Sequence, residues 1–164
     1  MLKIVLKLGN DVSTDIIYPG RYMATVHPNE TPQYAFADFK EFNQKLNSNE
    51  IQKGSIIVAG KNFGCGSSRE QAVSCLKGHN LVILAESFAR IFLQNAINLG
   101  LKIIIVPDIE AVENDEIELK EDKVININTG KIFKIIPFSK TQQEMLDAGG
   151  LIQYTRKLLL KKTS

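Results

Sequence analysis

The residues best suited to chemistry lie in one short segment, GKNFGCGSSRE, which spans residues 60–70. Three glycines, one cysteine and two adjacent serines precede an Arg-Glu pair in it. A glycine loses more backbone entropy than any other residue when its conformation is fixed, so the segment indicates a backbone that must turn sharply or approach a ligand closely. The ligand classes to weigh are a phosphate, a metal ion and another anion.

Three known chemistries can be tested against the spacing in this segment. A Walker-type phosphate loop requires Gly-x-x-x-x-Gly-Lys-Ser/Thr, whereas here Arg69 follows the two serines. A dinucleotide fingerprint requires a third glycine at the position that Arg69 occupies. A metal or thiol site would use Cys65, but Cys75 is ten residues away and His27 and His79 are the only histidines, which is poor ligand spacing. None of the three chemistries fits.

The segment lies between a predicted strand and a predicted helix. The apolar run at 55–59 precedes it, and an apolar helix face follows over 69–78. Two more apolar runs, at 81–85 and 103–106, flank an amphipathic helix over 88–99. This β-loop-α-β-α-β order predicts parallel strands joined by right-handed crossovers. In such a sheet, ligands bind where the carboxyl ends of the strands feed the helices, which is where the segment lies.

The rest of the chain predicts a second, antiparallel part. Residues 112–137 alternate apolar and polar side chains around an Asn-Thr-Gly turn, with Ile125 and Ile127 at alternating apolar positions. Further predicted elements are a strand over 2–7, one or two short helices over 31–46, and helices over 139–147 and 151–161. The fold class is therefore α/β, with a small parallel sheet flanked by helices plus an antiparallel β unit, in a single domain over 1–164.

The start of the predicted helix is suited to bind an anion. Ser67 or Ser68 falls near the N-cap, and Glu70 lies in the first turn. The first N–H groups of a helix lack intrahelical partners and carry partial positive charge, and Arg69 adds a planar two-pronged donor for a carboxylate. The spacing therefore favours carboxylate or phosphate binding. A tight turn with a helix cap and no ligand is the plainer alternative.

Composition and charge narrow the class of protein. Hydrophobic content is 44% and net charge is +2, values that fit a soluble globular protein and argue against a broad basic surface for nucleic acid. No apolar run is long enough to span a membrane, and the N-terminal MLKIVLKLGND lacks the long apolar region of a signal peptide. Two cysteines are too few for a disulfide framework, so we expect a cytoplasmic protein.

Three separated motifs resemble the swivelling domain of the aconitase superfamily. GKNFGCGSSREQA resembles its signature loop, GNDVSTDIIYPGRYM its opening segment, and ESFARIFLQNAINLGL the helix after its second core strand. With DAGGL near the C-terminus, the resemblance covers nearly the whole chain. It implies a swivelling β/β/α domain of the kind found in the stand-alone small subunits of the 3-isopropylmalate dehydratase and homoaconitase family, especially the short archaeal-type ones.

The resemblance also implies half of an enzyme. Members of this family are hydro-lyases that remove water from, and return it to, a small hydroxy di- or tricarboxylic acid. Their [4Fe-4S] cluster is ligated by cysteines of the large subunit, and this chain has only two cysteines where a cluster needs three or four thiolates. The implied partner is a large, cluster-bearing subunit, with no cofactor bound by this chain. Turnover is expected only when the two subunits are combined.

Individual roles can be carried over by position from the family. Its catalytic serine matches Ser67, which takes a proton from the substrate carbon. Ser68, Arg69 and Gly66 match the neighbours that contact a substrate carboxylate. A serine hydroxyl is a weak base unless its deprotonated form is stabilised. The helix start and Arg69 are expected to supply part of that stabilisation.

Substrate selection in this family is implied to lie in the loop formed here by Tyr22, Met23, Ala24 and Thr25. Homoaconitase-type relatives place an arginine at the third position, where this chain has Ala24. Without that cation a longer acid would leave a buried carboxylate unpaired, which is costly, so isopropylmalate is favoured over homocitrate. A methyl-substituted malate, the substrate of a dimethylmalate-type dehydratase, satisfies the same pocket. Arg21, just before the loop, is a possible cation for a longer acid.

Two further interpretations follow from the same segments. Thr14 and Asp15 are expected to be structural, capping a turn and hydrogen-bonding the signature loop. A different class of function is a non-catalytic module that binds a carboxylate or a phosphate without a partner subunit. Such a module predicts ligand binding by the isolated chain, whereas the enzyme-subunit interpretation predicts activity only with a large subunit.

Overall fold

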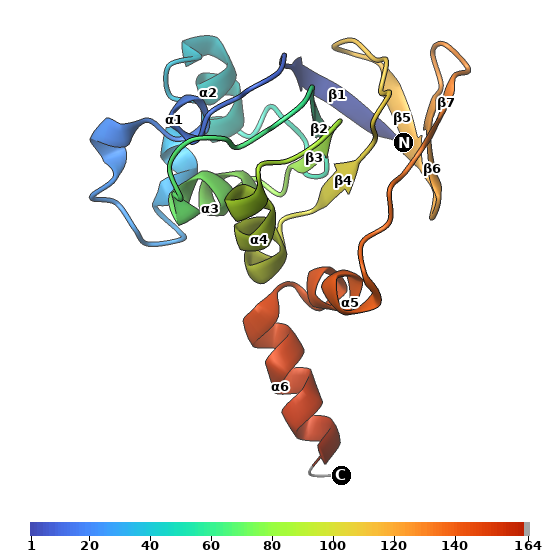
Figure 1. Cartoon of the computed structure of the whole chain (residues 1–164). Helices are drawn as coiled ribbons and strands as arrows, with labels where there is room; N and C mark the ends of the chain where they lie inside the picture. Colours follow the sequence, from blue (N-terminus) through green and yellow to red (C-terminus); the bar gives the residue numbers. More distant parts are fainter. Residues whose placement is uncertain (163–164) are drawn as a thin grey trace.

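The structure, a computed structural model, describes residues 1–162. Seven strands form one curled sheet, and the helices other than the C-terminal one pack on its outer face (Figure 1). The strands are β1 (Leu2–Lys7), β2 (Ile56–Ala59), β3 (Val82–Ala85), β4 (Ile103–Ile105), β5 (Glu116–Leu119), β6 (Lys123–Asn126) and β7 (Ile132–Lys134). The helices are α1 (Thr14–Ile17), α2 (Lys40–Asn47), α3 (Glu70–Gly78), α4 (Arg90–Leu99), α5 (Lys140–Ala148) and α6 (Leu151–Lys162), with short 3-10 helices η1 (Gly20–Tyr22) and η2 (Thr31–Tyr34).

The strand order is β4-β3-β2-β1-β5-β6-β7. The strands β1 to β4 pair in parallel and β5 to β7 pair antiparallel, which confirms the predicted α/β class with its two parts. What the sequence does not show is that both parts share one sheet. The second edge of β1 pairs with β5, with Leu2 opposite Ile117. A bridge between Ile105 and Ile136 brings the two far ends together, so the sheet curls toward closure and covers its edges.

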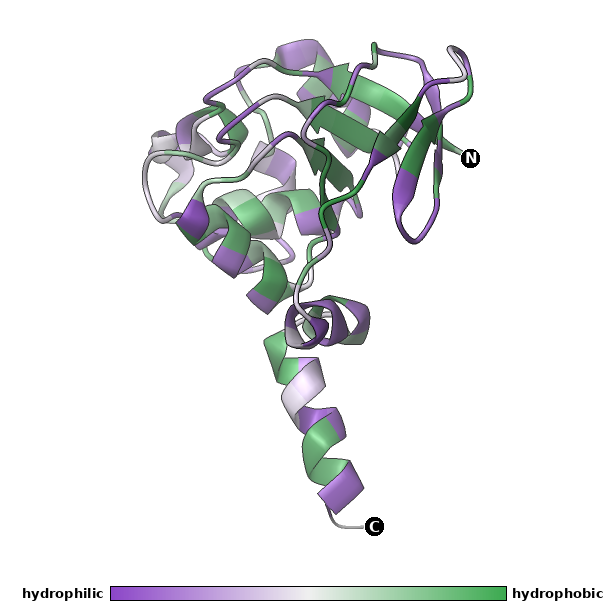
Figure 2. Cartoon of the chain, turned by 45° about the vertical axis from the view of Figure 1, so that its right-hand side comes forward, coloured by the Kyte–Doolittle hydropathy of each residue, from purple (hydrophilic) through white to green (hydrophobic). Residues whose placement is uncertain are grey.

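Two apolar cores lie on the two faces of this sheet. In β2, Ile57 and Ala59 face the helices, whereas Ile56 and Val58 face the inside of the curl. All four side chains are buried, which explains why this strand is apolar at every position rather than at alternate ones. Residues of the antiparallel strands, such as Phe133, complete the inner core. Figure 2 shows the parallel strands as predominantly hydrophobic ribbons.

The C-terminal helices are attached through three glycines. Gly100 ends α4 in a left-handed conformation, and a Cβ on it would lie 2.3 Å from the backbone carbon of Gly149. A Cβ on Gly150 would lie 2.5 Å from the carbonyl oxygen of Asn98. The Gly-Gly pair of DAGGL is therefore explained by backbone contact between α4 and the turn from α5 to α6. From this turn α6 projects away from the sheet (Figure 1), and none of its residues is buried.

Most predicted elements are confirmed, and two details differ. The four-residue helix α1 begins at Thr14 and Asp15, where the sequence predicts a capped turn rather than a helix. On β6, Val124 and Asn126 are buried, while Ile127, the residue after the strand, is exposed, so the apolar alternation of Ile125 and Ile127 does not mark the buried face. The helices in residues 1–162 are all too short or too polar to cross a membrane.

Replacing Gly64 by alanine is expected to lower the free energy of unfolding by about 2–4 kcal/mol. Gly64 has a φ of +82°, and a Cβ on it would lie 2.2 Å from the Phe92 ring of α4. The left-handed backbone and the overlap with the ring both cost free energy. Urea unfolding of the purified chain measures the change. Gly9→Ala is the control, because nothing lies within 4 Å of a Cβ at Gly9. Equal stability of the two variants would contradict the packing role of Gly64.

Candidate functional site

The loops that follow β1, β2 and β3 meet at the carboxyl edge of the parallel strands. The signature loop, residues 60–70, lies between the other two. Its Gly64 N–H donates to the carbonyl of Val12 at 2.7 Å, in the loop after β1. Its Phe63 N–H donates to the carbonyl of Ser87 at 3.0 Å, in the loop after β3. The segment singled out by its residue types is therefore held on both sides at the edge where ligands bind in parallel sheets.

The three glycines of the signature loop are needed for different reasons. A Cβ on Gly60 would lie 2.0 Å from the side-chain oxygen of Asn10, so this glycine admits the neighbouring loop. Gly64 admits the Phe92 ring in the same way. Gly66 has a φ of +93° and no atom closer than 3.6 Å to a Cβ, so its backbone conformation is the reason for glycine there. Of the three, only Gly66 is exposed, where its backbone can meet a ligand.

Ser67 and Ser68 lie near the N-cap of α3, as predicted, but neither of them caps it. The helix begins at Glu70, and its N-cap residue is Arg69, whose side chain makes no capping bond. The carbonyl of Ser67 accepts hydrogen bonds from the Thr14 hydroxyl at 3.0 Å and from the Arg69 N–H at 2.8 Å, which fixes the turn. Both serines are exposed, and within residues 1–162 neither hydroxyl has a hydrogen-bond partner.

The turn before α3 also leaves backbone donors unused. Among the described residues, the N–H groups of Gly66, Ser67 and Ser68 donate no hydrogen bond, and neither do those of Glu70 and Gln71, the first two residues of α3. The nine residues of α3 place the positive end of a helix dipole at this point. Unpaired donors, positive potential and two hydroxyls at one exposed turn are the features that suit a helix start to bind an anion.

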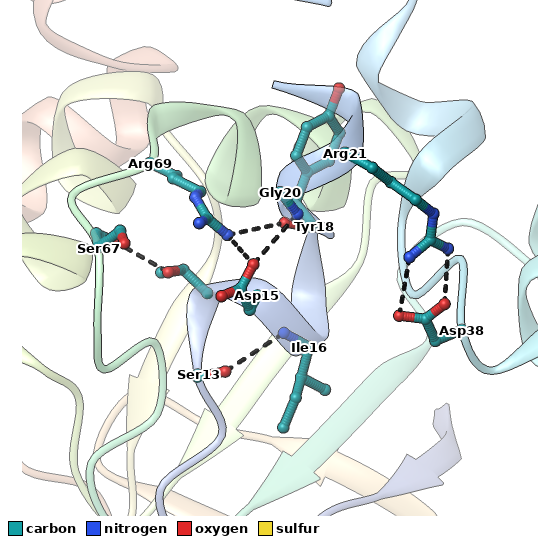
Figure 3. A network of polar contacts seen from close by, with 10 residues as sticks. Ser13, Asp15, Ile16, Tyr18, Gly20, Arg21, Asp38, Ser67 and Arg69 are labelled. Carbon is teal, nitrogen blue, oxygen red and sulfur yellow. Dashed lines mark hydrogen bonds and ion pairs between the residues drawn. The ribbon is translucent and has the colours of Figure 1, made fainter. Parts of the chain in front are cut away.

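Arg69 is mostly buried and forms an ion pair with Asp15 (Figure 3). Its side chain is 11% exposed, compared with 64% for that of Asp15. The hydrogen bond from the guanidinium keeps the pKa of the Asp15 carboxyl below its usual value, so this carboxylate stays charged at neutral pH. Asp15 also accepts from the Gly20 N–H at 3.1 Å. Within residues 1–162 the buried Nε of Arg69 has no acceptor, so the guanidinium keeps an unused donor.

The helix α1 holds the residues that support this turn. Ser13 caps α1 with its side chain, and Asp15 lies in its first turn. The Thr14 N–H donates to the carbonyl of Cys65 at 2.8 Å, and its hydroxyl donates to that of Ser67. These bonds confirm the structural role predicted for Thr14 toward the signature loop. The sequence signal for α1 is a capping serine followed by an acidic residue in the first turn, which marks a helix start.

The loop expected to select the substrate lies beside α3, the helix that follows Ser67 and Ser68. The side chain of Gln71, in the first turn of α3, donates a hydrogen bond to the carbonyl of Met23 at 3.3 Å. Met23 is 45% exposed, and Ala24 is exposed as well. We call the stretch from Gly66 to Arg69 the serine turn. The structure therefore brings residues 22–25 next to the serine turn, with an apolar surface facing outward.

Arg21 is engaged away from this surface. Its guanidinium forms two hydrogen bonds with Asp38, at 2.6 and 3.3 Å, and lies over the Tyr22 ring at 4.7 Å from the ring centroid. The hydrogen bonds from Arg21 lower the pKa of the Asp38 carboxyl. Figure 3 shows the Arg69 side chain pointing toward Asp15, whereas the Arg21 side chain points away from Asp15 toward Asp38. The arginine placed beside Ser67 is therefore Arg69, and Arg21 is occupied elsewhere.

Comparison with known proteins identifies the fold family. The family model described as the aconitase C-terminal domain matches residues 9–107, a range that contains the whole serine turn and the ion pair beside it. The chain belongs to the aconitase C-terminal domain family. The 3-isopropylmalate dehydratase small subunit of Ruminiclostridium cellulolyticum is 44% identical over 161 residues, which cover 94% of this chain and 96% of the relative. That of Methanosarcina acetivorans is 39% identical, with 95% and 96% covered.

A solved structure extends the similarity beyond the matched range. The crystal structure of a 3-isopropylmalate dehydratase (leuD) from Methanocaldococcus jannaschii superimposes with a TM-score of 0.85 at 40% sequence identity. The superposition covers 99% of this chain and 98% of that chain, so it includes the antiparallel strands and the C-terminal helices. The predicted membership of the aconitase superfamily, with small subunits of 3-isopropylmalate dehydratase as relatives, is confirmed.

In the described part of the chain, the side chains of this aconitase C-terminal domain offer no site for an iron-sulfur cluster. Residues 1–162 hold no group of three or more His, Cys, Asp or Glu side chains placed to bind a metal ion. Cys75 is fully buried, and burial raises the pKa of its thiol, so it stays protonated at neutral pH. Cys65 is partly exposed in the signature loop, without a second thiol beside it.

Proposed function

We propose that this chain is the small subunit of a [4Fe-4S] hydro-lyase that interconverts 2- and 3-isopropylmalate by dehydration and rehydration, a step of leucine biosynthesis. The observation that carries the proposal is the pair of exposed serines at the start of α3, beside the nearly buried Arg69. The relatives named 3-isopropylmalate dehydratase small subunit support the reaction and the substrate class, because they match this chain over almost its full length.

Ser67 is the residue that we assign to proton transfer. Its hydroxyl oxygen, once deprotonated, takes a proton from the substrate carbon and returns it during rehydration. Backbone N–H donors and the positive end of α3 stabilise the deprotonated oxygen. Ser68, Arg69 and Gly66 bind a substrate carboxylate through a hydroxyl, a guanidinium and a backbone N–H. The unbonded hydroxyls and N–H groups of this turn support these roles.

The site is open to solvent on this chain alone. Ser67 and Ser68 are exposed, whereas a deprotonated serine needs an environment from which water is excluded. A large subunit that covers the turn would complete the site. We assign the [4Fe-4S] cluster to that subunit, because residues 1–162 offer no ligand set for it. The two unpaired cysteines suit a reducing compartment, which supports a cytoplasmic location.

The turn at residues 22–25 supports isopropylmalate as the substrate. Met23 and Ala24 offer an apolar surface of the kind that an isopropyl group needs. A longer tricarboxylic acid such as homocitrate needs a cation for its distal carboxylate, and Arg21 is bound to Asp38 instead. A methyl-substituted malate is apolar at the same position, so a dimethylmalate-type dehydratase is the second candidate that this surface favours.

Reconstitution tests the proposal against its rivals. The purified chain is combined anaerobically with its large subunit, and turnover of 3-isopropylmalate, homocitrate, citrate and dimethylmalate is measured side by side. We expect no turnover by either subunit alone and the highest kcat/KM on 3-isopropylmalate when both are present. Calorimetric titration of the isolated chain with each acid and with phosphate provides the comparison. Tight binding by the isolated chain, with no turnover after reconstitution, would establish a non-catalytic binding module instead.

Replacing Ala24 by arginine is expected to shift the preference of the reconstituted enzyme toward longer acids. The new guanidinium pairs with the distal carboxylate of homocitrate and removes apolar surface from the isopropyl pocket. The ratio of kcat/KM for homocitrate to that for 3-isopropylmalate should rise about tenfold or more, the scale of gaining one matched polar contact. Gln153→Arg, which adds the same charge on the exposed helix α6, is the control. An unchanged ratio in the Ala24 variant would remove residues 22–25 from substrate selection.

A further inference from the structure

We infer that Tyr18 is a positioning residue for the substrate-selecting turn, residues 22–25, and so helps to determine which acid the site accepts. The inference rests on the proposed function, because it takes this turn to meet the substrate. It concerns a residue that lies outside both the turn and the signature loop. The contacts of its hydroxyl, its ring and its carbonyl each contribute to the inference.

The Tyr18 hydroxyl contacts both ends of the turn. Its oxygen lies 3.1 Å from the carbonyl oxygen of Tyr22 and 3.2 Å from that of Thr25. The hydroxyl has one proton, which it shares between the two carbonyls. The Thr25 N–H also donates to the Tyr22 carbonyl at 2.9 Å, so a backbone bond and a side chain close the turn together. Burial raises the pKa of Tyr18, so its hydroxyl remains a donor throughout the physiological range.

Aromatic packing fixes the Tyr18 ring and the first residue of the turn relative to one another. Tyr18 is fully buried, and Tyr34 meets it edge to face at 6.2 Å between centroids. Tyr34 in turn stacks on Tyr22, with centroids 4.1 Å apart and ring planes 12° from parallel. The Arg21 guanidinium also lies over Tyr22, held by its ion pair with Asp38. Tyr22 is thus fixed by a ring and by a cation that is itself anchored.

Tyr18 also connects the turn to the arginine of the site. Its carbonyl accepts a hydrogen bond from Arg69 Nη1 at 3.4 Å, while its hydroxyl holds the turn. Met23 and Ala24 are exposed, so the position of their apolar surface depends on the backbone of the turn rather than on packing of their side chains. Fixing that backbone relative to Arg69 sets the distance between the guanidinium, which donates to the substrate carboxylate, and the apolar surface. That distance distinguishes an isopropyl group from a longer acid.

A pair of matched variants, Tyr18→Phe and Tyr34→Phe, tests the inference. Each removes one hydroxyl from the same aromatic cluster and keeps the ring. Among the described residues the Tyr34 hydroxyl makes no hydrogen bond, so its loss leaves the turn unchanged. Hydrogen exchange of the isolated chain reports the order of residues 22–26 without any substrate. We expect exchange there to rise about five- to tenfold in Tyr18→Phe, the effect of losing one ordinary hydrogen bond, and to stay at the wild-type rate in Tyr34→Phe.

Kinetics of the reconstituted enzyme provide the second readout. In Tyr18→Phe we expect kcat/KM for the preferred acid to fall about five- to tenfold, mainly through KM, because the proton-transfer residue is untouched. The preference over longer acids should narrow at the same time, which a loss of stability alone does not produce. Urea unfolding of the variant confirms that the domain stays folded under the assay conditions.

The outcomes separate this inference from the proposed function. If residues 22–26 of Tyr18→Phe exchange hydrogen at the wild-type rate, the positioning role is overturned, whichever acid is the substrate. Faster exchange with an unchanged substrate preference would overturn the role in selection. Absence of 3-isopropylmalate turnover by the reconstituted wild type would contradict the proposed function, while the exchange comparison would still decide whether Tyr18 fixes the turn. If the reconstituted enzyme prefers another acid, the substrate preference is measured as the ratio of kcat/KM for that acid to kcat/KM for longer acids.

Discussion

Replacing Ser67 by alanine is expected to lower kcat of the enzyme reconstituted with its large subunit by about 10²–10⁴-fold, the usual contribution of a positioned proton-transfer group. KM should change little, because Ser68, Arg69 and the backbone donors that bind the carboxylate remain. The fold should be unaffected, since the Ser67 hydroxyl has no partner within residues 1–162 and only its carbonyl supports the turn. Steady-state kinetics and the unfolding midpoint of the isolated chain measure these two effects separately.

Two serine variants serve as comparisons for that result. Ser48→Ala, at the exposed end of α2 and outside the loops of the site, should leave kcat and KM at wild-type values. Ser68→Ala should raise KM more than it lowers kcat, because Ser68 is assigned to carboxylate binding. Turnover near the wild-type rate in Ser67→Ala, on every acid that the enzyme accepts, would show that another group removes the proton.

The position of the serine turn can be predicted from the sequence because local signals define it. The apolar runs that became β2 and β3 are buried on both faces, and the amphipathic pattern that became α4 keeps its period over several turns. The pairing of Arg69 with Asp15 has no such signal. These residues are 54 positions apart, and α1, which holds Asp15, is too short for a periodic pattern. A hydrogen bond between residues so far apart in the chain depends on the folded backbone. The sequence therefore predicts a substrate carboxylate as the partner of Arg69 and does not reveal Asp15.

The antiparallel part shows why alternation alone can mark the wrong face. In β6 the buried positions are Val124 and Asn126, whereas Ile127 is 42% exposed. Asn126 is tolerated inside because its side-chain N–H donates to the buried Asp115 carboxylate at 2.7 Å. A buried polar pair whose hydrogen bonds are satisfied costs little, and here it occupies a core position that hydropathy assigns to isoleucine. The partner lies in a different strand connection, so the sequence pattern of β6 does not reveal it.

Replacing Arg69 by lysine is expected to lower kcat/KM of the reconstituted enzyme roughly 10²-fold, because a point charge cannot reproduce a planar fork of donors. In the wild type, Nη1 binds Asp15, whereas Nη2 makes no hydrogen bond within residues 1–162 and, unlike Nε, is not fully buried. One guanidinium can therefore hold Asp15 and still offer donors to a substrate carboxylate. A lysine ammonium that stays with Asp15 leaves the substrate carboxylate without a cationic partner. Steady-state kinetics on the preferred acid measure the loss, which should appear in both KM and kcat.

The companion variants for this prediction separate charge from geometry. Arg156→Lys makes the same exchange on the exposed helix α6 and should leave kcat/KM unchanged. Asp15→Asn removes the negative partner and keeps Arg69, so a substrate carboxylate no longer competes with Asp15 for the guanidinium.

If Arg69 acts only by holding Asp15, both Arg69→Lys and Asp15→Asn should leave KM unaffected and lower stability alone. If Arg69 binds substrate, Arg69→Lys should raise KM and Asp15→Asn should lower kcat through a misplaced guanidinium. Wild-type kinetics in Arg69→Lys would restrict the anion site to Ser67, Ser68 and the helix start.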